Sequence, residues 1–400
     1  MTDPQPARPT LRQNLRGLPR EAWLLFAGAF VNRLGTFVLP FMTLYLTDQG
    51  YRPAQAGLGL AAYGLGALIA QGAGGLLADR IGRRNAIIVS MLGGGACALS
   101  LLIVDGLWPV VGVVGLMGFV GELYRPASSA LVADLVPPHA RVAAFSAYRM
   151  MLNLGWAVGL ALGGLLFDRN PHLLFVGDAV TSAGFALVAW RALPHGVRTT
   201  KHEERHLERA RTSIRRDAGF MLFLGAVFMT AVVYMQNAST FALHLHDLGF
   251  SATTYGALQA TNGLLVVLLE LPITSWTQHH RRTSMVALGA LLVGAGFVSL
   301  SVADTLPALV LMVVLWTLGE IVESPASSAF VADRAPEHVR GRYQGAFGSM
   351  FAIAAVVGPL LGSALYDVNP DVLWFACGVV GAASAGLALA AGRRPTPTAA

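Results

Sequence analysis

The chain has 400 residues, of which 54% are hydrophobic and only 12% are charged. That charged share is about half of the ~25% found in a typical soluble domain. A mean hydropathy of +0.58 leaves too few polar side chains to cover a surface that faces water. The composition therefore predicts an integral membrane protein and excludes a soluble enzyme, a nucleic-acid binder and a secreted disulfide scaffold.

Runs of about 20 mostly apolar residues, the length needed to cross a bilayer, occur twelve times in two groups of six. We expect spanning helices at 22–47, 54–78, 86–104, 107–133, 142–166 and 171–193, and again at 219–246, 252–276, 284–303, 306–332, 341–366 and 371–391.

These runs divide the chain into two predicted six-helix bundles joined by a charged linker. No apolar stretch with a small-residue cleavage site occurs in the first 20 residues, so we expect no signal peptide. The predicted parts are an N-terminal tail (1–21), the first bundle (22–193), a linker (194–218), the second bundle (219–392) and a C-terminal tail (393–400).

The basic residues predict the orientation in the membrane. With the N-terminus inside, 23 of the 28 Lys and Arg residues fall in cytoplasmic segments, and the outer loops hold only Arg52 and Arg169. This is the distribution of the positive-inside rule. The net charge of +6 is therefore a topology signal and predicts no nucleic-acid partner.

Two cysteines, Cys97 and Cys377, lie inside apolar runs and have no histidines nearby in the sequence. We expect both to be packing residues. No metal site and no cofactor is predicted.

The two halves resemble each other at an offset of 199 residues. Residues 126–141 (PASSALVADLVPPHAR) match 325–340 (PASSAFVADRAPEHVR) at 11 of 16 positions, and the same offset pairs Asp168 with Asp367 and Gly57 with Gly256. A parallel repeat places a pseudo-twofold axis along the membrane normal. We therefore expect a central cavity between the halves.

The segment between the second and third spans reads GLLADRIGRR. It resembles the loop motif G-x-x-x-D-R/K-x-G-R-R/K of the major facilitator superfamily of transporters. The resemblance to this superfamily covers nearly the whole chain. The resemblance implies an all-α fold of two pseudo-symmetric six-helix bundles. The matching residues, to which it assigns a conformational switch, are Gly75, Asp79, Arg80, Gly82, Arg83 and Arg84.

The types of residue in this motif suit a conformational switch. We expect Gly75 to allow close helix approach, Gly82 to permit a tight turn and Asp79 to cap or pair with a helix end. Ion pairs of this loop could hold the two halves together on the inner side. The alternative is that its arginines only anchor the topology.

Asp134, at the inner end of the fourth span, is the expected partner of Arg83 or Arg84. The equivalent loop of the second half reads QHHRRT and keeps only a basic pair. This loss argues against a symmetrical inner latch.

The fifth span carries Gly155, Gly159, Gly163 and Gly164. It is similar to the G-x-x-x-G-P-x-x-G-G pattern of drug–proton antiporters, with Leu160 in place of the proline. Glycines at this spacing also suit close helix packing alone. The overall pattern looks most like bacterial multidrug exporters of the MdtH type.

Ionisable groups within spans are costly and should face a partner or a wet cavity. Glu122 and Arg125 are three residues apart and can pair. Glu320 and Glu323 repeat that spacing as two like charges, which repel in a low dielectric. We expect Glu320, Glu323 and Glu122 to carry protons; the alternative is structural pairing with arginines across the interface.

Other polar residues on the expected cavity helices would contact substrate, although some could simply join helices by hydrogen bonds. This predicted substrate-cavity set is Asn32, Arg33, Tyr124, Arg125, Tyr148, Arg149, Asn153, Asn237 and Asn262.

The sequence thus predicts a monomeric secondary transporter of a bacterial inner membrane that exchanges protons for small amphipathic compounds by alternating access. Two alternatives remain open: proton-coupled uptake of a metabolite or lipid translocation, and a membrane sensor without flux. No phosphate-loop or nucleophile motif points to an enzyme.

Overall fold

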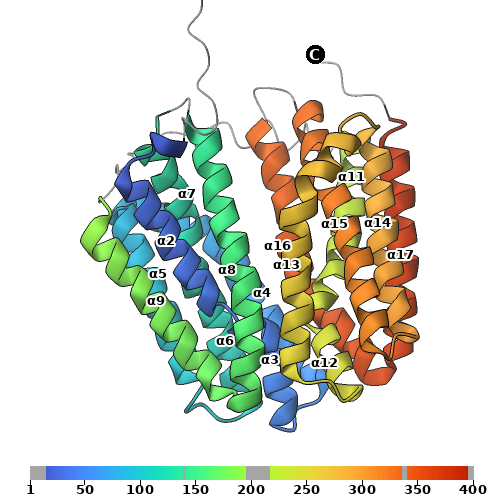
Figure 1. Cartoon of the computed structure of the whole chain (residues 1–400), viewed down its shortest axis with the longest axis horizontal. Coiled ribbons are helices and arrows are strands. Elements are labelled where there is room, and N and C mark those ends of the chain that lie inside the picture. Colours follow the sequence, from blue (N-terminus) through green and yellow to red (C-terminus); the bar gives the residue numbers. More distant parts are fainter. Residues whose placement is uncertain (1–14, 138–139, 195–216, 336–339, 395–400) are drawn as a thin grey trace, which may run out of the picture.

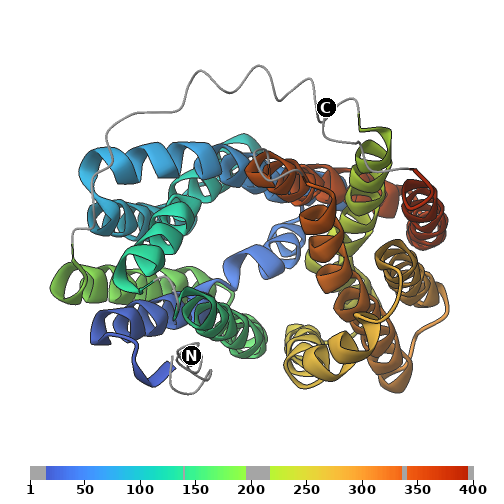
Figure 2. The same ribbon diagram turned by 90° about the horizontal axis from the view of Figure 1, so that it is seen from above.

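The computed structural model describes residues 15–137, 140–194, 217–335 and 340–394. Within these residues the secondary structure is helical, without strands. The helices form two groups that follow each other along the chain and lie side by side (Figures 1 and 2).

The first group, in its described part, consists of the following helical segments. They are α2 (Arg20–Gly35), α3 (Val38–Asp48), α4 (Pro53–Ile81), α5 (Arg83–Ser100), α6 (Leu107–Glu122), α7 (Tyr124–Leu135), α8 (Arg141–Arg169) and α9 (His172–Ala192).

The second group repeats this order and adds short 3-10 turns. It consists of α11 (Ala218–Tyr234), η2 (Met235–Ala238), α12 (Thr240–Asp247), α13 (Ala252–Thr277), α14 (Arg282–Val298), η3 (Ser299–Ser301), α15 (Leu306–Arg334), α16 (Arg340–Val368) and α17 (Pro370–Ala391).

The described segments combine into the twelve predicted spans. The first span is broken between α2 and α3, the fourth between α6 and α7, and the seventh at η2. Eleven candidate spans in the described residues are long and apolar enough to cross a bilayer. The predicted third span, α5, is not among these eleven because it is less apolar. Its first turn holds Arg83, Arg84 and Asn85, and its middle holds three consecutive glycines.

The part boundaries remain predictions, although the described helices fit them. α9 ends at Ala192 and α11 begins at Ala218. The predicted tails and linker fall largely outside the described residues.

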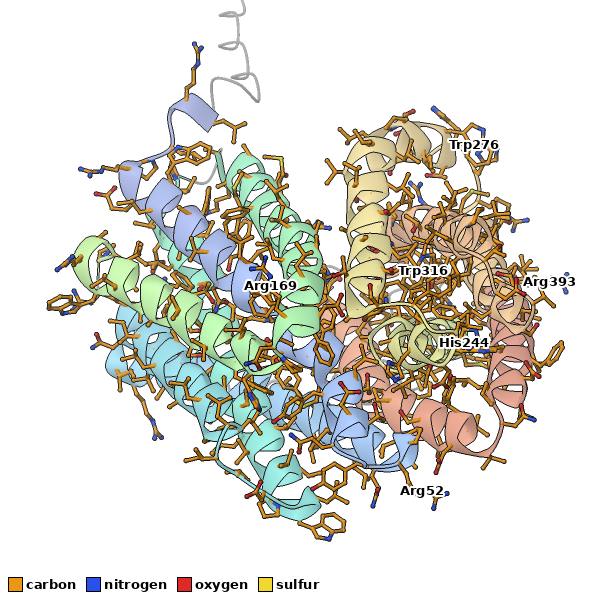
Figure 3. The ribbon with its side chains drawn as sticks, turned by 60° about the horizontal axis from the view of Figure 1, so that its bottom comes forward. Arg52, Arg169, His244, Trp276, Trp316 and Arg393 are labelled. Atoms are coloured by element: carbon orange, nitrogen blue, oxygen red, sulfur yellow. The ribbon has the colours of Figure 1, made fainter. Side chains whose placement is uncertain are left out.

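The two groups diverge toward one end, which we call the upper end, where α2 and α11 begin (Figure 1). At the opposite, lower end they meet. Figure 3 brings this lower end forward and labels Arg52, which precedes α4. α4 packs against α16 and α8 against α13 across the boundary between the halves.

Glycines allow these cross-half contacts. A Cβ added to Gly64 on α4 would stand 2.6 Å from the carbonyl oxygen of Ala355 on α16. Its repeat partner Gly263 on α13 would meet the Cβ of Ala157 on α8 at 2.7 Å. Because no larger residue fits at either glycine, both helix pairs approach closely; the contact is with backbone at Gly64 and with the alanine side chain at Gly263.

Two acidic residues add polar contacts at the lower end. The Asp168 carboxylate accepts hydrogen bonds from the backbone N–H groups of Ala252 (3.0 Å) and Thr253 (2.9 Å), at the N-terminus of α13. Its repeat partner Asp367 pairs with Arg52 at 3.1 Å, just before α4. These two contacts therefore lie at pseudo-symmetric positions. We call the set of contacts between the halves at this end the lower closure.

We predict that Gly64→Ala opens or destabilises the lower closure. The new methyl group would overpack the α4–α16 contact, at a cost of about 1–3 kcal/mol. The melting temperature of the detergent-solubilised protein should fall, and cysteines introduced near Asp168 should become more accessible to thiol reagents.

Gly72→Ala is the matched control on the same helix, because nothing lies within 4 Å of its added Cβ. It should be neutral or stabilise by up to about 1 kcal/mol through helix propensity. Equal effects of the two substitutions would contradict a closure that depends on glycine.

Candidate functional site

A cavity of about 300 Å³ lies between the halves. Its wall is mostly apolar, with a few polar groups, as is usual for small-molecule sites. It is lined from both halves by residues that include Leu39, Leu60, Tyr63, Gly64, Gln71, Glu122, Arg125, Met235, Ala238, Phe351, Ala355 and Pro359. We call this the central cavity.

Glu122 and Arg125 form the charged part of the central cavity. They make an ion pair across the break between α6 and α7, as their spacing predicts. The hydroxyl of Tyr63 on α4 donates to Glu122 Oε1 at 2.8 Å. Glu122 is therefore held by one cation and one neutral donor.

The second half holds an acid in a similar setting. The amide of Asn262 on α13 donates to Glu320 Oε2 at 3.0 Å and to Thr317 Oγ1 at 2.9 Å. Tyr234 lies beside the same carboxyl group. Asn262 is the repeat partner of Tyr63, since 199 residues separate them, so each half presents a donor from this position to an acid on the facing helix.

Glu323 does not share the surroundings of Glu320. It is 8% exposed, and its Cβ would stand 2.6 Å from a Cβ added to Gly289 of α14. No hydrogen-bond donor or basic group contacts its carboxyl among the described residues. Glu320 and Glu323 thus meet different neighbouring helices, α13 for the first and α14 for the second, and their role as proton carriers stays a prediction.

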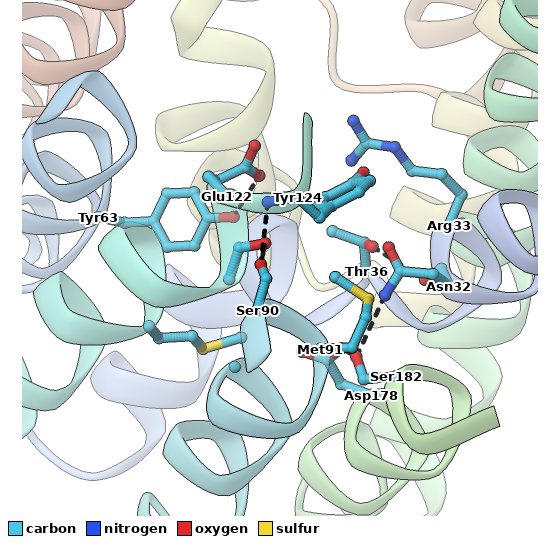
Figure 4. Close-up of a pocket in the computed structure, with 13 residues that line it drawn as sticks. Asn32, Arg33, Thr36, Tyr63, Ser90, Met91, Glu122, Tyr124, Asp178 and Ser182 are labelled. Atoms are coloured by element: carbon cyan, nitrogen blue, oxygen red, sulfur yellow. Dashed lines mark hydrogen bonds between the residues drawn. The ribbon is translucent and has the colours of Figure 1, made fainter. Parts of the chain in front are cut away.

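Several predicted cavity residues lie inside the first half instead. Asn32, Arg33 and Tyr124 line a smaller cavity of about 30 Å³ (Figure 4). Asn32 donates to Ser182 at 3.1 Å. Tyr148 is buried in the apolar core and packs against Phe26. The placement of Tyr148 at a cavity surface is therefore corrected to a core position.

The remaining predicted residues have mixed surroundings. Arg149 and Asn153 on α8 are exposed. Asn237 is half-buried, and its backbone carbonyl accepts from the Tyr255 hydroxyl at 3.0 Å and from Gln259 at 3.2 Å. Contact of any of them with substrate stays a prediction.

The motif loop at the upper end forms the expected turn and ion pair. Gly82 has φ +89°, which favours glycine, and joins α4 to α5. Arg83 pairs with Asp134 of α7 and also donates to the Ala130 carbonyl at 3.0 Å. Both partners belong to the first half, so in this conformation the pair stabilises one half and does not join the two.

The expected packing role of Gly75 is wrong. Nothing lies within 4 Å of a Cβ added there. The close approach is made by Gly74, whose added Cβ would stand 2.6 Å from the carbonyl oxygen of Leu123. In a helix, neighbouring residues point in different directions, and the sequence alone favoured the wrong one of the two.

The second half does retain a counterpart of the Arg83–Asp134 pair. Arg282 and Asp333, each 199 residues further along, approach to 3.7 Å and are largely exposed. Like Arg83–Asp134, this pair lies within one half and does not join the two, so the expectation that there is no symmetrical inner latch stays a prediction.

The glycines of α8 all serve helix packing. Gly155 and Gly159 lie against α2, with the carbonyl oxygen of Phe30 2.8 Å from a Cβ added to the first and that of Leu34 2.8 Å from one added to the second. Gly163 faces Phe37, and Gly164 faces the start of α13. Packing alone therefore accounts for these positions.

Two buried acids lie outside the sites predicted from the sequence. Asp178 on α9 lies in the small cavity of the first half. Asp217 caps α11 by accepting from the Phe220 N–H at 2.9 Å and pairs with Arg334 at 2.6 Å. The intramembrane position of Asp178 was a signal for it. Asp217 gave none, because it sits in a charged segment.

Cys97 and Cys377 are buried free thiols. Within the described ranges, no group of three or more His, Cys, Asp or Glu side chains could hold a metal ion.

Comparison with known proteins identifies related sequences along most of the chain. The profile of the Major Facilitator Superfamily matches residues 25–246 and 222–400. The multidrug resistance protein MdtH of Escherichia coli is 28% identical over 369 residues, covering 87% of this chain and 88% of MdtH. A Na(+), Li(+), K(+)/H(+) antiporter of Planococcus maritimus is 25% identical, with 87% and 88% covered.

Solved structures share the fold at low sequence identity. The nucleoside transporter NupG has a TM-score of 0.80 at 14% identity, covering 94% of this chain and 100% of its own. A POT family transporter in complex with a thioalcohol-conjugated peptide has a TM-score of 0.76 at 15% identity, covering 94% and 99%. These likenesses support the predicted fold of two six-helix bundles.

We predict that Asp134→Asn lowers stability by about 1–3 kcal/mol, because it weakens a charge-assisted hydrogen bond of the mostly buried Arg83. Asp333→Asn, the matched change in the second half, should cost about 0–1 kcal/mol, as expected of an exposed pair. Thermal unfolding of the two purified variants measures the difference. An equal loss in both would contradict the contrast in burial.

Proposed function

Because the chain belongs to the Major Facilitator Superfamily, and is therefore a membrane transporter rather than an enzyme, we propose that it exports small amphipathic, drug-like compounds in exchange for protons. It would act as a monomer in the bacterial inner membrane, through alternating access. The observation that carries this proposal is the placement of one hydrogen-bonded acid in each half, Glu122 and Glu320, on the helices that face α4 and α13.

The central cavity supports the substrate class. Its wall combines apolar side chains with Tyr63, Gln71 and the Glu122–Arg125 pair. Apolar surface and the two aromatic rings of Tyr63 and Phe351 suit a hydrophobic compound, and the carboxylate suits a partial or full positive charge on it.

The proposed orientation follows from the basic residues. The positive-inside distribution assigns the upper end to the cytoplasm. Because the described contacts between the halves lie in the lower parts of α4, α8, α13 and α16, we infer a state open toward the cytoplasm. Rocking of one half against the other would open the lower end and close the upper one.

The proposed cycle uses acids as exchange sites. Protons from outside bind Glu320. Glu323 on the same helix and Glu122 in the other half are further proton carriers. Proton binding lowers the affinity of the cavity for the substrate. Release of the protons to the cytoplasm restores the binding state. A carboxyl group held by neutral donors, as Glu320 is by Asn262, can change protonation without leaving a fixed cation unpaired.

The names of two relatives agree with this type of reaction. One is called a multidrug resistance protein and another a cation/proton antiporter. We carry from them only the reaction type, exchange of a compound for protons.

Proton-coupled uptake of an anionic metabolite is the second candidate. The observation in its favour is Arg125, whose guanidinium lines the central cavity. Its pairing with Glu122 reduces the charge available to an anion, so we rank uptake below export.

We predict that Glu320→Gln abolishes efflux driven by a pH gradient. Glutamine keeps the hydrogen bond to Asn262 but cannot exchange a proton. The uptake of ethidium, used as a fluorescent test compound, into everted vesicles under an imposed pH gradient measures the coupled flux. Glu323→Gln, Glu122→Gln and the Glu320/Glu323 double variant should also reduce it.

Glu21→Gln, at the start of α2, is the matched control and should transport as the wild type does. Exchange of ethidium across vesicles without a pH gradient should survive in Glu320→Gln, since substrate binding does not need the proton. Wild-type coupled transport by the Glu320/Glu323 double variant would remove this mechanism.

A further inference from the structure

Asp178 is a buried acid inside the first half, away from the central cavity. Its side chain on α9 is 5% exposed and lines the cavity of about 30 Å³ shown in Figure 4. Ser182, one turn further along α9, donates to Asp178 Oδ1 at 3.3 Å. Ser182 in turn accepts from the amide of Asn32 on α2 at 3.1 Å. The three side chains form a hydrogen-bonded row.

No basic group neutralises this carboxylate among the described residues. Arg33 lines the same cavity, but its guanidinium lies 5.6 Å over the ring of Trp156 and points away from Asp178 (Figure 4). The other titratable groups on the cavity wall are Tyr63 from α4, Glu122 from α6 and Tyr124 from α7; α5 contributes none. An ionised carboxylate without a cationic partner is costly within a membrane. A proton or another bound cation would remove this cost by neutralising its charge.

The second half serves as an internal comparison. At the positions 199 residues further along, Asn32, Asp178 and Ser182 are replaced by Ala231, Cys377 and Gly381. There α11 still packs against α17 without any charged side chain at these positions. The packing of this fold therefore does not require an acid at this place, which favours a functional reason for Asp178.

The available ligand atoms define the class of ligand. Carboxylate, hydroxyl and amide oxygens bind hard cations. A single uncompensated negative charge matches one positive charge. The volume of about 30 Å³ exceeds the roughly 10–15 Å³ that one water molecule needs, so an ion or a water fits.

We propose that this cavity binds one small monovalent cation, either a proton or an alkali ion, on the Asp178 carboxylate. Ser182 and Asn32 position the carboxylate. Glu122 lines both this cavity and the central one, and so connects them. The binding of the cation to Asp178 does not depend on the proposed export. Any role of this cation in driving transport does rest on the proposed export.

The test measures binding without transport. The purified full-length protein is titrated with NaCl or LiCl against choline chloride at constant ionic strength, and its melting temperature is recorded. Infrared difference spectra over a pH titration report a protonated carboxyl group. We expect the wild type to be stabilised by Na⁺ or Li⁺, or, if the ligand is the proton, to show a buried carboxyl signal.

Asp178→Asn should abolish whichever response the wild type shows, while the exposed Asp105→Asn, its matched control, should retain it. Ser182→Ala keeps the charge and guards against misfolding of the first variant. It should weaken the apparent affinity about two- to tenfold, the worth of one hydrogen bond. Neither response depending on Asp178 would overturn the proposal.

Glu320→Gln separates this inference from the proposed export. If Glu320→Gln transports normally but the cation response still depends on Asp178, export by that mechanism fails and the cation site stands. If coupled export is lost in Glu320→Gln but the cation response is the same in the wild type and Asp178→Asn, the cation site fails alone.

Discussion

The halves of this transporter are held together at the lower end by close helix contacts at positions where only glycine fits. Gly64 and Gly263 occupy the same place in the two repeats, and each admits a neighbouring helix from the other half. Close approach of this kind depends on shape and not on charge. The Arg52–Asp367 ion pair also crosses the lower end, but its guanidinium is largely exposed, so water can replace that contact when the halves separate. Alternating access needs an interface that is stable in one state and can be broken at a low cost in free energy.

Polar groups then differentiate two halves that share one plan. Position 63 of the first repeat and position 262 of the second both donate to an acid across the helix pair, but one is a tyrosine and the other an amide. Glu122 has Arg125 as a fixed cation, whereas Glu320 has only neutral donors among the residues described. The duplication thus provides a common geometry, and individual substitutions give each half its own electrostatics.

Much of this architecture could be predicted from the sequence, because span length, basic loops and the 199-residue offset are local properties. The Glu122–Arg125 pair followed from helical spacing alone. The direction of Glu323 did not, since residues three apart lie on one face but the neighbours they meet depend on helix packing. Asp217 and Arg334 are distant in sequence, and their repeat partners, Leu18 and Leu135, are apolar, so no repeat comparison pointed to them.

The contact of Asp168 with α13 has a consequence for how the lower end tolerates mutation. The carboxylate binds peptide N–H groups, which every residue except proline possesses, so these two hydrogen bonds do not depend on which side chains stand at 252 and 253. On the opposite side α4 begins with Pro53, and there the same task falls to the guanidinium of Arg52. On the partner side, only proline would remove an N–H group that Asp168 binds, whereas any substitution of Arg52 that removes the guanidinium breaks its ion pair with Asp367.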